Sequence, residues 1–462
     1  MPKGTRKVKF GFDEDHLTHY GGAWLIQQFC DRIHLRSLLT RYIHIAQRTG
    51  DYHPSQLLLA LLFSIIIGLR RISKTETLRY DHALIEMLGL DRFPDAGSLR
   101  RFLKRLPTAN IREIAQLHDS LRAWLFPLPE ERHSLILDVD SVVLVVYGHA
   151  EGAKVGYNPK KPGRRSYHPL FCFESTFQEF WHGIWRRGDA ASSTGILPFL
   201  KICLAKVPPT VKRHRLRFRM DAGFFGKRVV EFLDEVGCGY VIVAKEYKTI
   251  KAAAQRVRFT ELKNQWQYGE FEYQPTHWKA AHRFVVVRRP IPEDPEEAKQ
   301  LTLFKDRKYS YHVFVTNLEL DAWRAYLFYN GRANIEKSNR EFLYDYPLSK
   351  IPTQSWTANV AFFQLVLLAA NLVHWFKRLC LETPYTTATV ETIRTDFLVL
   401  PAKLVRAKNR SLVKLPRDYP HREKFERAAR RIGALRLPEN FRICPKGAQR
   451  LRRGVAKIVK KP

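Results

Sequence analysis

Apolar residues recur at spacings of three and four from about residue 20 to residue 125. The stretches "AWLIQQFCDRIHL" and "SLRRFLKRL" show this pattern clearly. The pattern predicts amphipathic helices, and Asp95 or Ser98 is expected to cap the start of the second one. Residues 1–128 are therefore predicted to form a helical N-terminal region. Its basic faces fit either contact with DNA or solvated charge on a packing domain.

Two runs are more apolar than the rest and raise the question of a membrane span. The run at 56–69 is too short to cross a bilayer. The run at 359–376 is longer, but Asn359, Gln364, Asn371 and His374 interrupt it. Both runs are predicted to be buried core helices, and a membrane role is the weakest of the functions considered.

The pattern changes near residue 134, where β-branched runs bounded by charge and glycine predict strands. Strand and helix stretches then alternate, which is typical of an α/β core. In chain order they are "SLILDVDSVVLVVYG", "PLFCFESTF", "EFWHGIWRRG", "TGILPFLKICLAKV", "RLRFRMDAGFF", "GKRVVEFLDEVG" and "YVIVAKE". Residues 129–250 and 320–350 are assigned to this core.

Three further strand-like stretches, "WQYGEFEYQ", "RFVVVRRP" and "YSYHVFVTN", predict a β-rich insertion at 251–319. Helical texture resumes at Leu320. Residues 351–462 are predicted to be a helical, basic C-terminal region. Residues 401–462 hold 20 Lys and Arg against 4 Asp and Glu, a net charge of +16.

The charge of the whole chain indicates its partner more than its fold. In 462 residues there are 78 Lys and Arg against 45 Asp and Glu, a net charge of +33. Such an excess favours a polyanion, most often nucleic acid, over a merely basic soluble protein. The six cysteines are scattered with no C-x-x-C pair, and the N-terminus has no apolar signal region. Both observations predict a protein of the reducing cytoplasm.

Carboxylates on strands are the first candidates for chemistry in so basic a chain. In "LDVDSVV", Asp138 and Asp140 share one face because side chains alternate along a strand. An Asp within an apolar strand is costly unless it is paired or binds a metal ion. Asp221 in "FRMDAGFF" follows a strand directly, where an ordinary turn or capping role is the alternative.

A third carboxylate, Glu336, lies in the polar stretch "YNGRANIEKSNREF" at 329–342. If this stretch is one helix, Tyr329, Arg332 and Glu336 lie within roughly 60° of one another around its axis. A phenol, a guanidinium and a carboxylate then share a polar face that suits a phosphate group. The alternative is an Arg–Glu ion pair on a wet surface. The Asn330-Gly331 dipeptide favours a turn, so the helix is expected to begin after it.

The order of these residues carries more weight than any one of them. Magnesium prefers oxygen ligands, and two such ions can clamp the attacking and leaving oxygens of a phosphodiester. A strand Asp, a strand-end Asp and a helical Glu, in that order, resemble the DDE transposases of bacterial insertion sequences. The Y-x2-R-x3-E pattern of Tyr329, Arg332 and Glu336 is similar to the signature of the insertion-sequence 4-like clan.

Other motifs are most similar to the insertion-sequence 1380 family within that clan. They are "DVDSVV", "YGHAEGAKVGYNP", "SYHPL", "RRGDAASS" and "RMDAGFF". The resemblance covers about residues 134–345. It implies a ribonuclease-H-like catalytic core with a β-rich insertion, flanked by helical regions. It also implies that Asp140, Asp221 and Glu336, separated by 81 and 115 residues, are the catalytic and metal-binding residues. Asp138 stays open as a rival for the first position.

The same resemblance implies a DNA transposase acting in the bacterial nucleoid. It would use two Mg²⁺ ions, or Mn²⁺, to cut the element's ends and join the 3′-OH to target DNA, with a homodimer pairing the ends. Tyr329 and Arg332 are similar to residues that grip phosphates. The clan often has Lys seven residues after the Glu, where this chain has Leu343, and Arg340 is the candidate to replace it.

The loop "NPKKPGRR" is expected to contact the DNA backbone through its cations, against the alternative of a solvated loop. These cations are Lys160, Lys161, Arg164 and Arg165. Two other functions fit the sequence less well. One is a ribonuclease-H-like nuclease that cuts DNA without joining it. The other is an inactive, transposase-derived DNA-binding protein, against which the three acidic residues count.

Overall fold

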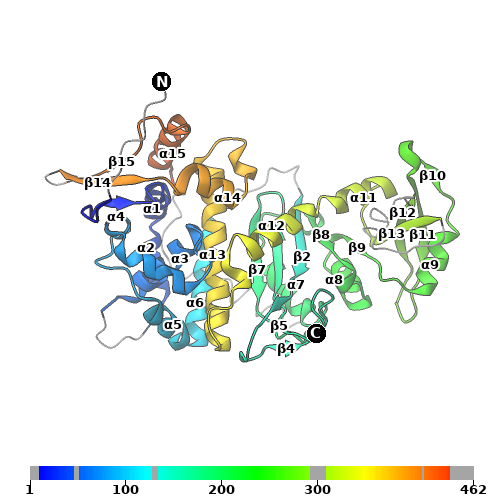
Figure 1. Cartoon of the computed structure of the whole chain (residues 1–462). Helices are drawn as coiled ribbons and strands as arrows, with labels where there is room; N and C mark the ends of the chain where they lie inside the picture. Colours follow the sequence, from blue (N-terminus) through cyan, green and yellow to red (C-terminus); the bar gives the residue numbers. More distant parts are fainter. Residues whose placement is uncertain (1–9, 46–50, 127–133, 292–307, 408–409, 438–462) are drawn as a thin grey trace, which may run out of the picture.

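The structure is a computed structural model that describes residues 10–45, 51–126, 134–291, 308–407 and 410–437. The side chains of residues 333–336, 338 and 407 lie outside this description. The molecule is elongated, with the N-terminal helices at one end and a group of strands at the other (Figure 1). One long helix, α13, runs between the helical end and the central sheet (Figure 1).

The N-terminal region is helical, as predicted. Its helices are α1 (Ala23–Arg32), α2 (Leu35–Tyr42), α3 (Pro54–Ile66), α4 (His82–Met87), α5 (Ala96–Arg105) and α6 (Thr108–Leu125), with the 3₁₀ segment η1 (Ile72–Tyr80) between α3 and α4. Asp95 caps α5 by accepting a hydrogen bond from the backbone N–H of Ser98, so the predicted cap is confirmed. The apolar faces of these helices share one core with α13.

A nine-stranded mixed sheet forms the centre of the protein, in the order β10-β11-β12-β13-β9-β8-β2-β6-β7. The strands are β2 (Leu135–Ser141), β6 (Leu170–Glu174), β7 (Glu179–Ile184), β8 (Leu216–Met220), β9 (Gly239–Val243), β10 (Thr260–Glu261), β11 (Gln267–Tyr273), β12 (His282–Pro290) and β13 (Tyr309–Thr316). β2, β8 and β9 run parallel, and the other pairs are antiparallel. The protein is therefore mixed α/β, and each predicted strand stretch is present.

The alternation of side chains along β2 decides which of them lie on each face of the central sheet. Leu135, Leu137 and Val139 are fully buried in one core with α7 (Ile196–Ala205) and α8 (Lys227–Glu235). Successive strand residues point to opposite faces, so Asp138 and Asp140 face the other side of the sheet. That side is covered by the helices that follow the insertion.

Those helices are α11 (Ala322–Asn330), α12 (Ala333–Tyr344) and α13 (Trp356–Cys380). α12 packs on the sheet through Phe342, whose ring lies 5.9 Å from Phe171 on β6 and 3.9 Å from Phe180 on β7, centroid to centroid. Two shorter segments near them are η3 (Ala222–Phe224), directly after β8, and η5 (Pro347–Ser349), directly after α12.

The strands of the insertion extend the central sheet instead of forming a separate one. β13 pairs with β9, and β12, β11 and β10 follow outward. This part forms the end of the molecule farthest from the N-terminal helices (Figure 1). Its remaining described elements are α9 (Lys248–Gln255) and η4 (Lys263–Gln265).

Smaller elements complete the description. A three-stranded sheet, β3-β5-β4, consists of β3 (Leu144–Val145), β4 (Lys154–Val155) and β5 (Arg165–Tyr167). Short helical segments are η2 (Arg213–Arg215), η6 (Tyr385–Thr387), α14 (Val390–Ile393) and η7 (Arg394–Leu398).

The expectation of helices alone in the C-terminal region is wrong for residues 402–414. β14 (Ala402–Ala407) and β15 (Arg410–Lys414) form a hairpin that pairs with β1 (Leu17–Thr18), and α15 (Arg422–Ala434) follows. Antiparallel pairing lets the apolar side chains Leu404 and Ala402 turn inward while the basic ones stay in solvent. The C-terminal region therefore packs on the N-terminal helices (Figure 1).

Both apolar runs are buried core helices, as predicted. α13 is long and apolar enough to cross a membrane by length and composition, and 78% of that window is buried inside the protein. Its polar residues account for the interruptions in the run. Asn371 donates to the carbonyl of Phe180 on β7 and accepts from its N–H, and its Nδ2 lies 2.6 Å from Nε2 of His118 on α6. This network joins the N-terminal region to the central sheet.

The His118 network predicts a specific loss of stability in acid. Burial lowers the pKa of His118 to about 3, so the folded protein holds the neutral ring. The stabilisation is complete above the unfolded value of about 6.5 and is lost as the pH falls toward 3. At pH 5 the free energy of unfolding should be about 2 kcal/mol lower than at pH 7 through this residue alone, at about 1.36 kcal/mol per pKa unit.

Chemical denaturation at both pH values measures this effect. His118→Gln retains an acceptor for Asn371 and should show a smaller difference between pH 5 and pH 7 than the parent. His214→Gln, a change at an exposed histidine, serves as the matched control. Equal pH dependence in the two variants would contradict the assignment.

Candidate active site

Two of the predicted catalytic carboxylates meet at one edge of the central sheet. β2 and β8 are parallel, and the last residues paired between them are Val139 and Met220. The next residues along the two strands are Asp140 and Asp221. Because the carboxyl ends of parallel strands lie at the same edge, residues 81 positions apart in the sequence become neighbours.

Asp221 is held in a fixed position by its own turn. Its Oδ1 accepts a hydrogen bond of 2.8 Å from the N–H of Gly223, which caps η3. Burial, together with the negative charge of Asp140, raises the pKa of Asp221 above its ordinary value. A buried carboxylate beside a second carboxylate is a common feature of catalytic sites.

Arg332 lies beside this pair and offsets part of its charge. Its Nη2 is 3.0 Å from Oδ1 of Asp140 and also donates to the carbonyl of Val139 at 3.3 Å. Burial alone lowers the pKa of Arg332, but Asp140, Tyr329, Asp221 and Asp138 outweigh it and the pKa is raised overall. The guanidinium that we expected on a DNA phosphate is therefore bound to the carboxylate of Asp140.

A second contact to Asp140 comes from α12. Nδ2 of the buried Asn339 donates to Oδ2 of Asp140 at 2.6 Å. The Oδ1 atom of Asn339 is buried with no hydrogen-bond partner among the described residues. Glu336 lies on the same helix, one turn before Asn339, but its side chain is outside the described part of the chain.

Asp138 and Asp140 have different surroundings in the structure. Asp138 is completely buried and forms a forked ion pair with Arg219 on β8, at 2.6 Å from Nε and 2.7 Å from Nη2. Both oxygens of Asp138 are thereby used, in geometry that suits a structural pair. Asp140 lies two residues further along, at the end of the strand and partly open to solvent.

Arg219 also connects the sheet to α11. Its Nη1 donates to the carbonyl of Phe328 at 2.8 Å, near the end of that helix. Gly331 permits this approach, since a Cβ atom there would lie 2.4 Å from Nη1 of Arg219. The stretch at 329–342 is thus two helices, with Tyr329 on α11 and Arg332 immediately before α12. The turn signal of Asn330-Gly331 is confirmed, and a single continuous helix is wrong.

The loop after β7 forms a wall of the site. Arg186 donates to the carbonyls of Ala191, Ser192 and Thr194, at 3.1, 3.1 and 2.8 Å. The hydroxyl of Ser192 is then 3.3 Å from that of Ser141, next to Asp140. A Cβ atom on Gly223 would lie 2.8 Å from the side chain of Ser192, so this glycine lets the loop pack on the Asp221 turn.

His168 completes this wall. Its Nδ1 lies 2.7 Å from the carbonyl oxygen of Ala190. Burial lowers the pKa of His168, while the charge of the nearby Asp140 raises it in part. The ring is therefore neutral at pH 7 and holds the loop beside the carboxylates.

The basic loop at 158–165 lies on the small β3-β5-β4 sheet that follows the first catalytic strand. Lys160, Arg164 and Arg165 are exposed. Lys161 is exposed too and donates to the hydroxyl of Tyr147 at 2.6 Å. Arg340 is exposed on α12. A DNA contact by any of these cations stays a prediction.

The donors present at the sheet edge fit a hard divalent cation. Asp140 and Asp221 supply adjacent carboxylate oxygens, which Mg²⁺ prefers. Burial is the main cause of the raised pKa of Asp221, and the negative charge of Asp140 adds to it, while Arg332 acts in the opposite direction. Among the side chains that the structure describes, no three His, Cys, Asp or Glu residues gather into one metal site. The third expected ligand, Glu336, is outside that set.

Three residues with a part in the site were not singled out from the sequence. Arg219 looks like an ordinary strand residue, Asn339 like a surface polar residue of a helix, and His168 only like part of the motif "SYHPL". Spacing offers one signal in retrospect. Asn339 follows Arg332 by seven residues, about two helical turns, so the two residues lie on the same side of the segment that contains α12.

Comparisons with known proteins identify the family of the chain. The family described as "Transposase DDE domain group 1" matches residues 1–437. A search of curated proteins found no match. Among solved structures, the chain is similar to the piggyBac transposase in a synaptic complex with hairpin DNA. That match has 12% identity and a TM-score of 0.44, and it covers 96% of this chain and 88% of the other.

The forked pair predicts that Asp138 is a structural residue. Asp138→Ala leaves Arg219 buried without its partner, so the free energy of unfolding should fall by about 3–5 kcal/mol. The double variant Asp138→Leu with Arg219→Met removes both charges and should recover most of that loss. Urea denaturation followed by circular dichroism measures both. A double variant as unstable as the single one would show that the pair does not act as a unit.

Proposed function

Because the chain belongs to the family of transposases with a DDE domain of group 1, we propose that it cuts the ends of an insertion sequence and joins them to target DNA. The family implies transposition and the use of divalent metal. We further propose that Asp140, Asp221 and Glu336 are the catalytic, metal-binding residues, and that the chain is a member of the insertion-sequence 1380 family. The adjacency of Asp140 and Asp221 at the ends of parallel strands carries the proposal.

The sheet supports a ribonuclease-H-like core. Strands β7, β6, β2, β8 and β9 are consecutive in the sheet, with the first three antiparallel and the last three parallel. This is the strand order expected of that fold, with the first acidic residue on the central strand. We divide the chain accordingly: an N-terminal region at 1–128, a core at 129–250 and 320–350, an insertion at 251–319 and a C-terminal region at 351–462.

Glu336 is assigned as the third ligand from its position in α12. It lies four residues after Arg332 and three before Asn339, and both of these residues contact Asp140. Residues three and four apart share a helix face. Mg²⁺ held by Asp140, Asp221 and Glu336, with Mn²⁺ as a substitute, would lower the pKa of the attacking water and neutralise charge on the phosphate.

The chain's own residues position the DNA strand for two displacement reactions. In the first, water adds its hydroxyl to phosphorus and the departing 3′ oxygen takes up a proton, which leaves a free 3′-OH and a 5′-phosphate. In the second, that 3′ oxygen attacks a target phosphodiester, whose own 3′ oxygen leaves with the proton. Arg332, with its forked donors, is placed to turn from Asp140 to the phosphate. Tyr329 and Arg340 are assigned to neighbouring phosphates.

The partner is DNA, at both the element's ends and the target. The charge of +33 favours a polyanion. Pairing two ends calls for two copies of the chain, so a homodimer on DNA is part of the proposal. The bacterial cytoplasm, at the nucleoid, is the proposed location.

Removal of the Asp221 charge is the direct test of the catalytic assignment. Asp221→Asn keeps an acceptor for the N–H of Gly223 and removes a metal ligand. This variant should bind a plasmid that carries the DNA flanking its gene but should cut it at least 10²-fold more slowly in Mg²⁺. It should also bind Mn²⁺ more weakly by calorimetry. Joined products from the parent distinguish a transposase from a nuclease.

Asp418→Asn removes a carboxylate from an exposed position and serves as the control. It should cut and join like the parent. Normal cleavage by Asp221→Asn would refute the assignment of Asp221, whatever the behaviour of the control.

The basic loop predicts a change in the salt dependence of binding. Each phosphate contact contributes about 0.9 to the slope of log affinity against log salt for duplex DNA. Changing Lys160, Lys161, Arg164 and Arg165 to Gln should make that slope shallower by up to about 3–4. Fluorescence anisotropy across a salt series measures it. An unchanged slope would show that the loop does not contact DNA.

A further inference from the structure

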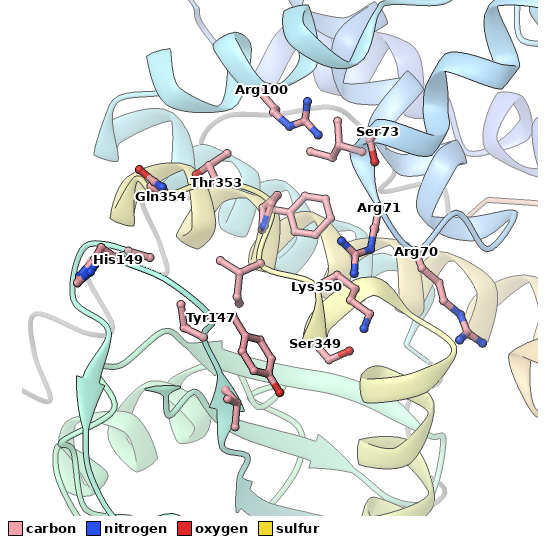
Figure 2. A pocket seen from close by; sticks show the side chains of 17 residues that line it. Arg70, Arg71, Ser73, Arg100, Tyr147, His149, Ser349, Lys350, Thr353 and Gln354 are labelled. Carbon is pink, nitrogen blue, oxygen red and sulfur yellow. The ribbon is translucent and has the colours of Figure 1, made fainter. Parts of the chain in front are cut away.

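A cavity of about 450 Å³ lies where the N-terminal helices meet the catalytic unit. Segments 70–73 and residue Arg100 line it from the helical side, and segments 145–150 and 349–354 line it from the catalytic side, with Phe362 of α13 (Figure 2). We call it the junction cavity. Neither Asp140 nor Asp221 lines it, so it is distinct from the candidate active site.

The lining of the junction cavity is strongly positive. Arg70, Arg71, Arg100 and Lys350 line it, together with His149, and no Asp or Glu does. Within the described part of the chain, none of the four cationic side chains forms a hydrogen bond or an ion pair. Arg71 and Lys350 reach into it from different walls (Figure 2). Asp345 is a nearby carboxylate, and its charge acts on Arg70. Like charges gathered in this way favour a multivalent anion as ligand.

The rest of the lining is apolar or aromatic, which suits a ligand with a flat apolar part. Ile72, Val146, Ile351 and Phe362 contribute apolar surface. Tyr147 is also in the lining and is 71% exposed, an unusual position for so large a ring. A stacking platform for a nucleic-acid base has this combination of exposed aromatic ring and surrounding cations.

Tyr147 connects the junction cavity to the basic loop. The Nζ atom of Lys161 lies 5.3 Å from the centre of its ring and bonds its hydroxyl. The hydrogen bond and charge of Lys161, with smaller contributions from Arg164 and Lys350, lower the pKa of Tyr147. Lys161 of the basic loop and Lys350 of the cavity lining therefore both act on Tyr147.

The size of the junction cavity distinguishes single-stranded from double-stranded DNA. A volume of 450 Å³ is typical of pockets that hold one drug-sized ligand, about the size of a nucleotide. A double helix, whose major groove alone is about 12 Å wide, cannot enter it. An unpaired stretch of one strand can place a base inside and its phosphates on the rim.

Two walls of the junction cavity come from segments that lie close in the sequence to residues of the candidate active site. Val145 and Val146 follow Asp140 by five and six residues. Ser349 is the last residue of η5, which comes shortly after α12, and Lys350 is the next residue. We propose that the junction cavity binds an unpaired stretch of the DNA strand, with its phosphates on Arg71, Arg100 and Lys350 and a base on Tyr147. This proposal rests on the proposed function, because it assumes that DNA is the substrate.

Metal-free binding measurements test the proposal separately from cleavage. The probe is a short single-stranded oligonucleotide that carries 2-aminopurine, mixed with the full chain bearing Asp221→Asn in the presence of EDTA. Changing Arg71, Arg100 and Lys350 to Gln should weaken binding at least tenfold. It should also make the salt slope shallower by about 2, at about 0.7 per single-strand contact. Affinity for a blunt duplex should change less than threefold.

The control changes three exposed cations on other elements, Arg41, Lys212 and Lys263, to Gln. It removes the same charge and should bind the oligonucleotide within threefold of its parent. Tyr147→Ala should abolish the quenching of 2-aminopurine fluorescence, and Tyr147→Phe should retain it. Circular dichroism and thermal unfolding establish that each variant is folded.

Several results would overturn the proposal. One is that the variant with Arg71, Arg100 and Lys350 changed to Gln binds the oligonucleotide as tightly as the control variant. Another is that this variant loses affinity for the duplex as much as for the single strand. A third is that inorganic phosphate or pyrophosphate displaces the oligonucleotide at the same concentration as DNA phosphate. If the parent never cuts DNA but the triple variant loses the oligonucleotide selectively, the proposed function fails and the junction cavity stands as a single-strand site.

Discussion

The parallel pairing of β2 with β8 is the constraint on which the rest of the site depends. It brings Asp140 and Asp221 to one sheet edge and makes their charges act on each other. The cost of placing two carboxylates side by side is large in a partly buried position. The protein offsets it with Arg332 and Asn339, both from the helical segment that follows the insertion.

A second pair on the same two strands fixes where that helical segment lies. Asp138 and Arg219 are paired in the strand register, and Asp138 binds the guanidinium of Arg219. The same guanidinium reaches the last turn of α11. Gly331 leaves room for it, and Arg332 is the next residue. The buried ion pair thus does more than balance charge, because it helps to position the start of α12 relative to the sheet edge that carries Asp140 and Asp221.

Much of this arrangement was predictable from local patterns, and the remainder depends on long-range contacts. β-branched and apolar runs identified the central strands, and the position of Asp221 directly after one of them indicated a sheet edge. Alternation also placed Asp138 and Asp140 on one face, but it could not say which of them lies beneath an arginine 81 residues away from Asp138. Asn339 and His168 were missed for the same reason, since their roles come from tertiary contacts alone.

The C-terminal hairpin shows the other limit. Basic residues interleaved with Leu and Val suit a helix or a strand equally, and the choice is made by β1, nearly 400 residues earlier, which offers a free edge to β14. The Asn330-Gly331 turn was a local signal, and it was correct. Local chemistry therefore predicted element boundaries better than it predicted partners.

The central claim is that Asp140 and Asp221 hold a divalent cation with Glu336. The most direct measurement is a crystal structure with Mn²⁺, located by its anomalous scattering. The account predicts a peak about 2.1 Å from oxygens of both aspartates, with Arg332 moved away from Asp140. A peak elsewhere, or none at all with the Arg332–Asp140 pair intact at saturating Mn²⁺, would contradict it.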